Sequence, residues 1–247
     1  MITVQVKVYR SSGFTLVEMA IVLALIGLIL GTGLTLLSAQ QEQRKIEETN
    51  ALLSDAREAL IGFAISSPVH PYLPCPDKTT AAGAGTANDG LEDRIAGACV
   101  TQEGNLPWVT LGMSPQTDSW INRLRYRVSA TFSNSTTGML LTSTGDINVL
   151  DTVGGATIAN NVPAVILSHG HNGLGATNAL CNPALCNANP APPVASSDEL
   201  ANTDGNTVFV SHSLAPAGAP GGAFDDQVTW ISPYILFNRM VQAGKLP

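Results

Sequence analysis

The chain is poor in charged and aromatic residues, which make up only 13% and 5% of its 247 positions. Acidic residues outnumber basic ones, and the resulting net charge of −7 would repel a phosphate backbone rather than attract it. A Walker motif, a dinucleotide-binding glycine motif and a Gly-x-Ser-x-Gly turn are all absent from the sequence. These absences argue against a nucleic-acid-binding protein and against the commonest classes of enzyme.

The few histidines do not form a recognisable catalytic or zinc pattern. Ser168–His169 and Ser211–His212 are neighbours in predicted strands, where adjacent side chains point to opposite faces and cannot act as a nucleophile–base pair. His169 and His171 would share a face, but no pair of cysteines has the spacing of zinc ligands. We therefore expect no catalytic residues and no zinc site.

Four cysteines are present, and an even number in an exported chain usually forms disulfides. Among the three possible pairings, sequence proximity favours Cys75–Cys99 and Cys181–Cys186, each closing a loop rich in Pro or Gly. The alternative is four reduced, buried thiols in a cytoplasmic protein. The export signal described next favours the disulfides.

One long apolar run lies near the N-terminus. Residues 14–37 contain a single charged residue, Glu18, and a short polar leader with Lys7 and Arg10 precedes them. The run is long enough to cross a bilayer core of about 30 Å at about 1.5 Å per residue. Because positive charge stays in the cytoplasm, we expect a single span of the inner membrane with the C-terminal body in the periplasm.

Glu18 is unusual inside such a run, since a carboxylate in hydrocarbon costs about 3 kcal/mol on insertion scales. Cleavage after Gly13 would give Phe14 a free, positively charged amine in the same apolar layer as Glu18, where opposite charges attract strongly. The pattern predicts that this carboxylate compensates such an amine. A plain single-span anchor with an incidental Glu is the alternative.

The segment Gly13-Phe14-Thr15-Leu16-Val17-Glu18, with a basic leader before it and an apolar run after it, resembles the processing motif of type IV prepilins. The resemblance implies that an inner-membrane prepilin peptidase cuts between Gly13 and Phe14 and methylates the new amine. It also implies that Glu18 neutralises the N-terminus of a neighbouring subunit during assembly into a filament.

Helical spacing continues over residues 38–66, where Ile46, Leu53 and Leu60 recur at every seventh position and form an apolar face. Three prolines between residues 68 and 74 then end the helix. The chain thus divides into four predicted parts: a leader at 1–13, a transmembrane or filament-core helix at 14–37, an amphipathic helical half at 38–66 and a periplasmic globular domain at 67–247.

The body is rich in Gly and Pro, as in a loop-rich β structure. A long helix followed by short strands is typical of an α+β fold, with an antiparallel sheet packed on the C-terminal half of the helix and with long disulfide-pinned loops. Together with the processing motif, this predicts the type IV pilin fold. Alternation and apolar runs predict strands at 123–132, 138–144, 164–168, 207–211 and 227–232, and a short amphipathic helix at 233–243.

The body also resembles, more weakly, the major pseudopilin of type II secretion. Residues 117–126 are similar to its Asp-Pro-Trp-Gly-Asn segment, and residues 167–173 and 224–230 are similar to its two calcium-loop segments. This sequence departs from that family where Ser119 and Ile121 replace a proline and a glycine, where Asn172 replaces an aspartate, and where about 50 residues separate the loop segments.

This second resemblance implies a Ca²⁺ site, and calcium is the one cofactor we expect. Calcium takes about six to eight oxygen ligands. The alternative is that the two aspartates simply begin a strand and that Asn172-Gly173 is a turn. The candidate ligands are the Leu167 carbonyl, the Asn172 amide, Asp225 and Asp226, with Asp198, Glu199 and Asp204 as spare candidates in the insertion.

The sequence therefore favours a structural subunit, a minor pilin or pseudopilin, of a type IV pilus or a type II secretion pseudopilus. Expected partners are prepilin peptidase, other pilin or pseudopilin subunits, the inner-membrane assembly platform and the lipid bilayer. A pilin-anchored adhesion or ligand-binding module, using loops 67–105 and 170–205, is a second hypothesis. An anchored enzyme is a third.

Overall fold

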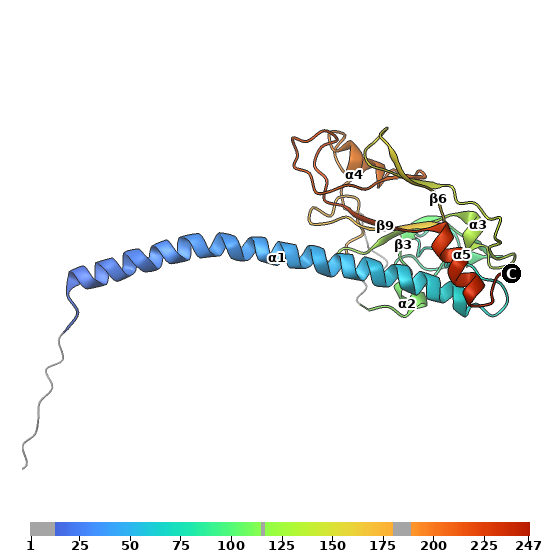
Figure 1. Cartoon of the computed structure of the whole chain (residues 1–247), viewed down its shortest axis with the longest axis horizontal. Coiled ribbons are helices and arrows are strands. Elements are labelled where there is room, and N and C mark those ends of the chain that lie inside the picture. Colours follow the sequence, from blue (N-terminus) through green and yellow to red (C-terminus); the bar gives the residue numbers. More distant parts are fainter. Residues whose placement is uncertain (1–12, 115–116, 180–188) are drawn as a thin grey trace, which may run out of the picture. The chain divides into compact units, whose positions relative to one another are not determined.

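The computed structural model describes residues 13–114, 117–179 and 189–247, without the side chains of residues 29–37. The chain divides into two compact units, Met1–Arg44 and Lys45–Pro247. Figure 1 shows the order of the elements, which begin with one long helix and continue with short strands and short helices. The α+β prediction is thereby confirmed.

Helix α1 (Leu16–Ser66, 51 residues) confirms the predicted helix apart from its first two residues. In its second half the predicted apolar face is buried at Leu53, Ala56 and Leu60, while Ile46 and Phe63 are partly buried. Of the residues that the structure describes, no helix combines the length and the apolar character needed to cross a membrane.

The main sheet has four antiparallel strands in the order β3 (Glu103–Asn105), β4 (Arg125–Val128), β7 (Ala164–Ser168) and β9 (Gln227–Ile231). One hydrophobic cluster joins Leu53 and Leu60 of α1 to Tyr126, Ile166 and Ile231 of this sheet. Helix α5 (Pro233–Gln242) adds Leu236 and Met240 to the same cluster. The second half of α1 is therefore part of the core of the body, as predicted.

A second sheet consists of β6 (Thr157–Val162), β5 (Ile147–Leu150) and β8 (Val208–Val210), with β5 antiparallel to β6 and parallel to β8. Its cluster includes Val149 and Phe209, and Val165 and Leu167 of β7 join them. Alternate residues of β7, such as Ile166, face the first cluster instead. Because both faces of β7 are buried, its sequence is continuously apolar rather than alternating.

Short elements fill the connections between the sheets. Strands β1 (Arg94–Ile95) and β2 (Ala98–Cys99) pair with each other, and the predicted Cys75–Cys99 disulfide ties this hairpin to the segment after α1. The predicted Cys181–Cys186 pair lies outside the described residues. The short helices are α2 (Trp108–Leu111), α3 (Ala130–Ser133) and α4 (Ser197–Ala201).

Two strand predictions need correction. Residues 138–144 contain one turn and irregular backbone rather than a strand, with Gly138 at φ +67° and the Ser143 N–H donating to the Leu140 carbonyl at 2.9 Å. The strand predicted at 123–132 ends at Val128, because the chain turns there into α3. The strands predicted at 164–168, 207–211 and 227–232 correspond to β7, β8 and β9, whereas β5 and β6 were not predicted.

Candidate functional site

The predicted processing bond lies just before helix α1. Residues 13–15 have no regular secondary structure, so the Gly13–Phe14 peptide bond is outside the hydrogen-bonded helix. Gly13 is exposed, and the Phe14 side chain is 81% exposed. A peptidase needs an accessible backbone that is free of helical hydrogen bonds, and both conditions hold at this bond.

Thr15 and Glu18 form a reciprocal set of hydrogen bonds at the start of α1. The Glu18 N–H donates to Thr15 Oγ1 at 3.2 Å, while the Thr15 N–H and hydroxyl donate to Glu18 Oε2 at 2.8 Å and 2.9 Å. This is a capping box, which satisfies main-chain donors that the first helical turn leaves without partners. The Thr-x-x-Glu spacing could have predicted it from the sequence.

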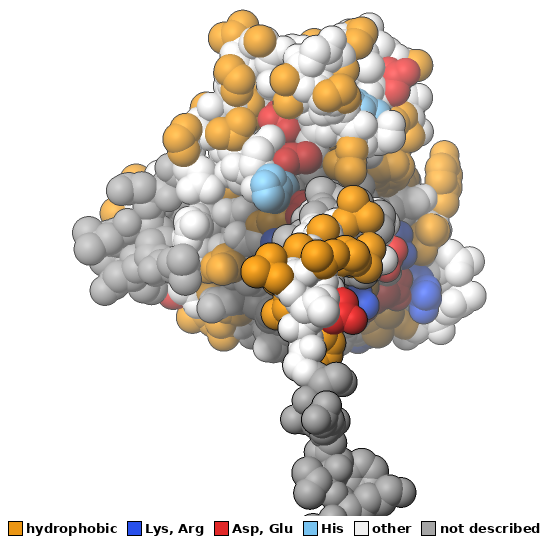
Figure 2. Space-filling model, turned by 90° about the vertical axis from the view of Figure 1, so that its left-hand side faces the viewer, with side chains coloured by type: hydrophobic (Ala, Val, Ile, Leu, Met, Phe, Trp, Pro, Cys, Tyr) orange, Lys and Arg blue, Asp and Glu red, His pale blue; other side chains and the backbone are white. Residues whose placement is uncertain are grey.

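The first turns of α1 expose large apolar side chains. Leu16, Leu23 and Leu28 are 87%, 63% and 69% exposed. Figure 2 shows the hydrophobic side chains gathered on this end of the helix. A contiguous apolar surface of this kind marks a site of contact with a membrane or with another protein.

A second candidate site is an acidic cluster in the body, made by Glu199 of α4 and by Asp225 and Asp226, which precede β9. One carboxylate oxygen from each of the three lies within 4.8 Å of the others. Ser168 of β7 pairs with Gln227 of β9, so the loop after β7 lies beside these aspartates. Gly170 permits the approach, since it has φ +57° and a Cβ there would lie 2.3 Å from the Asp225 carbonyl oxygen.

Glu199 and Asp226 are buried and Asp225 is partly buried, and the three carboxylates are only partly hydrogen-bonded. The Asp225 N–H donates to Glu199 Oε1 at 3.0 Å, but Glu199 Oε2 and Asp225 Oδ1 are buried without a hydrogen-bond partner among the described residues. Burial, and then repulsion from Glu199 and Asp226, raise the pKa of Asp225 to about 7. Burial also raises the pKa of Glu199. A bound cation would relieve this concentration of negative charge.

The structure brings together only some of the predicted calcium ligands. Asn172 lies beside the cluster but presents donors to it: its N–H donates to Asp225 Oδ2 and its side-chain amide donates to Glu199 Oε1, both at 2.8 Å. Glu199, expected only as a spare ligand, is a member of the cluster. Leu167 is the fourth of the five residues of β7, opposite Arg125 and Val228.

The other two spare candidates have contacts of their own. Asp198 accepts a hydrogen bond from the Val153 N–H at 2.9 Å, and its second oxygen lies 3.3 Å from His212 Nε2. Asp204 is exposed and accepts hydrogen bonds from the N–H and side chain of Asn206. The carboxylate cluster of the described residues thus consists of Glu199, Asp225 and Asp226.

The comparisons with known proteins bear on the N-terminal segment. Residues 9–34 match the family described as the prokaryotic N-terminal methylation motif. No curated protein and no solved structure matches the chain. The match includes the processing bond and Glu18, and it supports the recognition of the chain as a type IV pilin-like or pseudopilin-like protein.

The motif is that of a structural rather than enzymatic family. It suggests a membrane-anchored precursor that prepilin peptidase processes and that assembles with other pilins.

Proposed function

We propose that this protein is a minor pilin or pseudopilin, a structural subunit of a type IV pilus or a type II secretion pseudopilus. Prepilin peptidase cuts the chain after Gly13 and methylates the amine of Phe14. The subunit waits in the inner membrane with its body in the periplasm, and the assembly platform then adds it to the filament. The observation that carries the proposal is the methylation motif joined to an exposed apolar helix start with one carboxylate.

The membrane step rests on the sequence of residues 14–37, in which Glu18 is the only charged residue. Exposed leucines at the start of α1 favour lipid before assembly and neighbouring helices after it. The Glu18 carboxylate is exposed at the first helical turn, where an amine on Phe14 of a neighbouring subunit can reach it. Pairing of these two charges in an apolar environment sets the register between successive subunits.

The fold supports the same function. A long N-terminal helix whose second half is buried against an antiparallel sheet is the arrangement that we expect of a pilin. The body is longer than a minimal major subunit requires, which favours a minor position in the filament.

Mass spectrometry of the mature N-terminus, with protein from the native host, tests this proposal directly. We expect a chain that begins at N-methylated Phe14. A chain that keeps Met1, or one that is cleaved beyond Leu37, would contradict it.

We also propose that the acidic cluster binds calcium. Glu199, Asp225 and Asp226 would hold the ion, and the two buried oxygens without partners fit a hard cation. Its positive charge would hold α4 against the start of β9. The Leu167 carbonyl and the Asn172 amide stay predicted ligands.

Thermal unfolding of the full chain in detergent, with calcium or with EGTA, tests the calcium site. At about a hundred times its Kd, calcium would add roughly 2.7 kcal/mol to the free energy of unfolding. Asp225→Asn should remove most of this gain, whereas Asp204→Asn, which alters an exposed carboxylate in the same region, should keep it. An unfolding temperature that calcium does not change would refute the site.

A further inference from the structure

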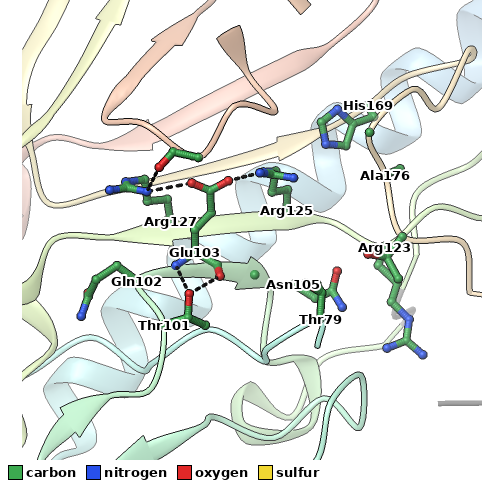
Figure 3. Close-up of a pocket in the computed structure, with 14 residues that line it drawn as sticks. Thr79, Thr101, Gln102, Glu103, Asn105, Arg123, Arg125, Arg127, His169 and Ala176 are labelled. Atoms are coloured by element: carbon green, nitrogen blue, oxygen red, sulfur yellow. Dashed lines mark hydrogen bonds and ion pairs between the residues drawn. The ribbon is translucent and has the colours of Figure 1, made fainter. Parts of the chain in front are cut away.

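A cavity of about 300 Å³ lies beside strands β3 and β4, apart from the methylation motif, and it adjoins the acidic cluster only through His169. Residues 101–105 form one part of its wall, and the loops that carry Ala176 and Gly205 form others. Figure 3 shows the side chains around it, with Glu103 between Arg125 and Arg127 and with His169 on a neighbouring segment. The volume is at the lower end of the range for small-molecule sites, which is about 300–1,000 Å³.

Three arginines line this cavity because they alternate along the chain. Arg125 and Arg127 are two residues apart in β4, where alternate residues share a face, and Arg123 lies two residues before Arg125, ahead of the strand. Arg125 and Arg127 both pair with the carboxylate of Glu103, the latter at 2.8 Å. Two guanidinium groups thus share one carboxylate, so these three side chains together carry a net charge of +1.

Arg123 has a different set of partners. It donates to the Asn88 carbonyl at 2.7 Å, lies 4.4 Å from the centre of the Trp108 ring and is 3.9 Å from Asp77. Figure 3 shows its guanidinium group turned away from Glu103. It is therefore a fixed part of the wall, and the remaining positive charge belongs to Arg125 and Arg127.

Several buried donors at the cavity have no acceptor among the described residues. They include the Nε atoms of Arg125 and Arg127. His169 is fully buried, and its Nε2 atom also has no partner among the described residues, but whether it donates or accepts depends on the tautomer. The other ring nitrogen of His169 lies 3.3 Å from Asp226. A buried donor without an acceptor is costly, so a ligand carboxylate toward which the two arginine side chains can turn would be favoured.

The rest of the lining is polar apart from Ala176 and three glycines, and it contains no Phe, Tyr or Trp. Thr79 and Thr177 supply hydroxyl groups, and Gln102 supplies a side-chain amide. Groups of this kind bind hydroxyls, and a guanidinium pair binds the planar oxygens of a carboxylate. The single excess charge matches a monoanion better than a dianion.

We propose that this cavity binds a small hydroxylated carboxylate, such as a sugar acid, through Arg125 and Arg127. Glu103 holds the two guanidinium groups in place while the cavity is empty, and the ligand carboxylate accepts hydrogen bonds from them. Threonine hydroxyls bind the hydroxyl groups of the ligand. This role is separate from filament assembly, and it would make the body a ligand-binding module as well as a structural one.

The test is titration calorimetry on the full-length protein in detergent, with D-glucuronate as the probe. D-Glucose serves as the uncharged control and inorganic phosphate as the competing anion. We expect saturable binding of glucuronate with a Kd of about 1 mM or below, weakened by salt, and no saturable binding of glucose or phosphate.

Two variants separate a binding role from a purely structural one. Arg125→Gln should weaken glucuronate binding at least about tenfold, since a charge-assisted hydrogen bond is lost. Glu103→Gln should strengthen binding several-fold, because it removes the competing carboxylate and raises the positive charge of the wall. Arg57→Gln, which removes a partly exposed arginine of α1 outside the cavity, is the matched control and should change nothing.

Thermal unfolding of each variant shows whether it is folded. A folded Glu103→Gln protein that glucuronate stabilises supports the proposal even if Arg125→Gln unfolds. The proposal is overturned if glucuronate does not bind, if glucose binds equally well, if phosphate alone binds, or if Glu103→Gln weakens binding in the folded protein.

Discussion

Helix α1 meets two different environments along its length. Near its start Leu16 and Leu23 are 87% and 63% exposed, whereas further on Leu53 and Leu60 are buried in the core of the body. The two halves are parts of one continuous helix, so secondary structure alone does not distinguish them. The difference indicates that the first half is selected for partners outside the chain and the second half for the stability of its own fold.

Loss of the carboxylate at the start of α1 should give the largest effect. We expect Glu18→Ala to be processed and folded but to be almost absent from filaments, because no charge would then compensate the new amine of a neighbour. Immunoblotting of sheared filaments, with total cellular protein as the control, measures this. If the variant enters filaments at the normal rate and in the normal amount, the assembly role of Glu18 is contradicted, and the chain is an ordinary membrane-tethered domain.

Truncating one leucine in each half of α1 should separate the effect on stability from the effect on assembly. Leu60→Ala should lower the free energy of unfolding by about 4 kcal/mol, as expected of a buried leucine in a close-packed core. Leu23→Ala, at an exposed position, should leave this free energy unchanged but reduce incorporation into filaments. Urea titration followed by circular dichroism measures the first quantity. An equal decrease in the free energy of unfolding of both variants would mean that the two halves of α1 do not differ in this way.

The disulfide belongs to the body, and its removal should affect stability alone. Cys75 and Cys99 are 24 residues apart, so reopening the loop should cost about 3 kcal/mol. Urea titration of the double variant Cys75→Ser/Cys99→Ser gives this value, and mass spectrometry shows whether processing at Phe14 continues. A failure of processing would show that the two units depend on each other.

The smallest effect should come from the capping box. Thr15→Val keeps the shape of the side chain but removes the hydroxyl that bonds to Glu18. We expect faster hydrogen exchange at the amides of the first helical turn and no change within the body. Thr15→Ser, which keeps the hydroxyl, is the control and should exchange like the unchanged protein.

Sequence patterns predicted the elements whose reasons are local. The helix was predictable because its apolar face repeats at helical spacing, and Cys75–Cys99 because the two cysteines are close in sequence. Strand β7 was predictable as a buried apolar run, yet nothing local indicated that it contacts two separate clusters. The pairing of β5 with β8 in parallel depends on a connection of more than fifty residues, which no short pattern encodes.

The candidate sites could likewise be predicted only where their residues are close together in the sequence. Gly13, Phe14 and Glu18 form a short motif that is visible in the sequence, and the family match includes it. Glu199 reaches Asp225 only because α4 packs near the start of β9, so its place in the cluster was not predictable. The arginines at 123, 125 and 127 alternate visibly, but their shared carboxylate comes from another strand.

The position of strand β7 determines how the body unfolds. Val165 and Leu167 pack in the cluster of the second sheet, while Ala164 and Ile166 pack in the cluster that contains helices α1 and α5, so β7 separates the two clusters and contacts both. We expect neither cluster to unfold while the other stays folded, because the loss of either would expose one face of β7 to solvent. Calorimetry should therefore record one sharp heat-absorption peak for the whole body, and a limited digest should release no stable half.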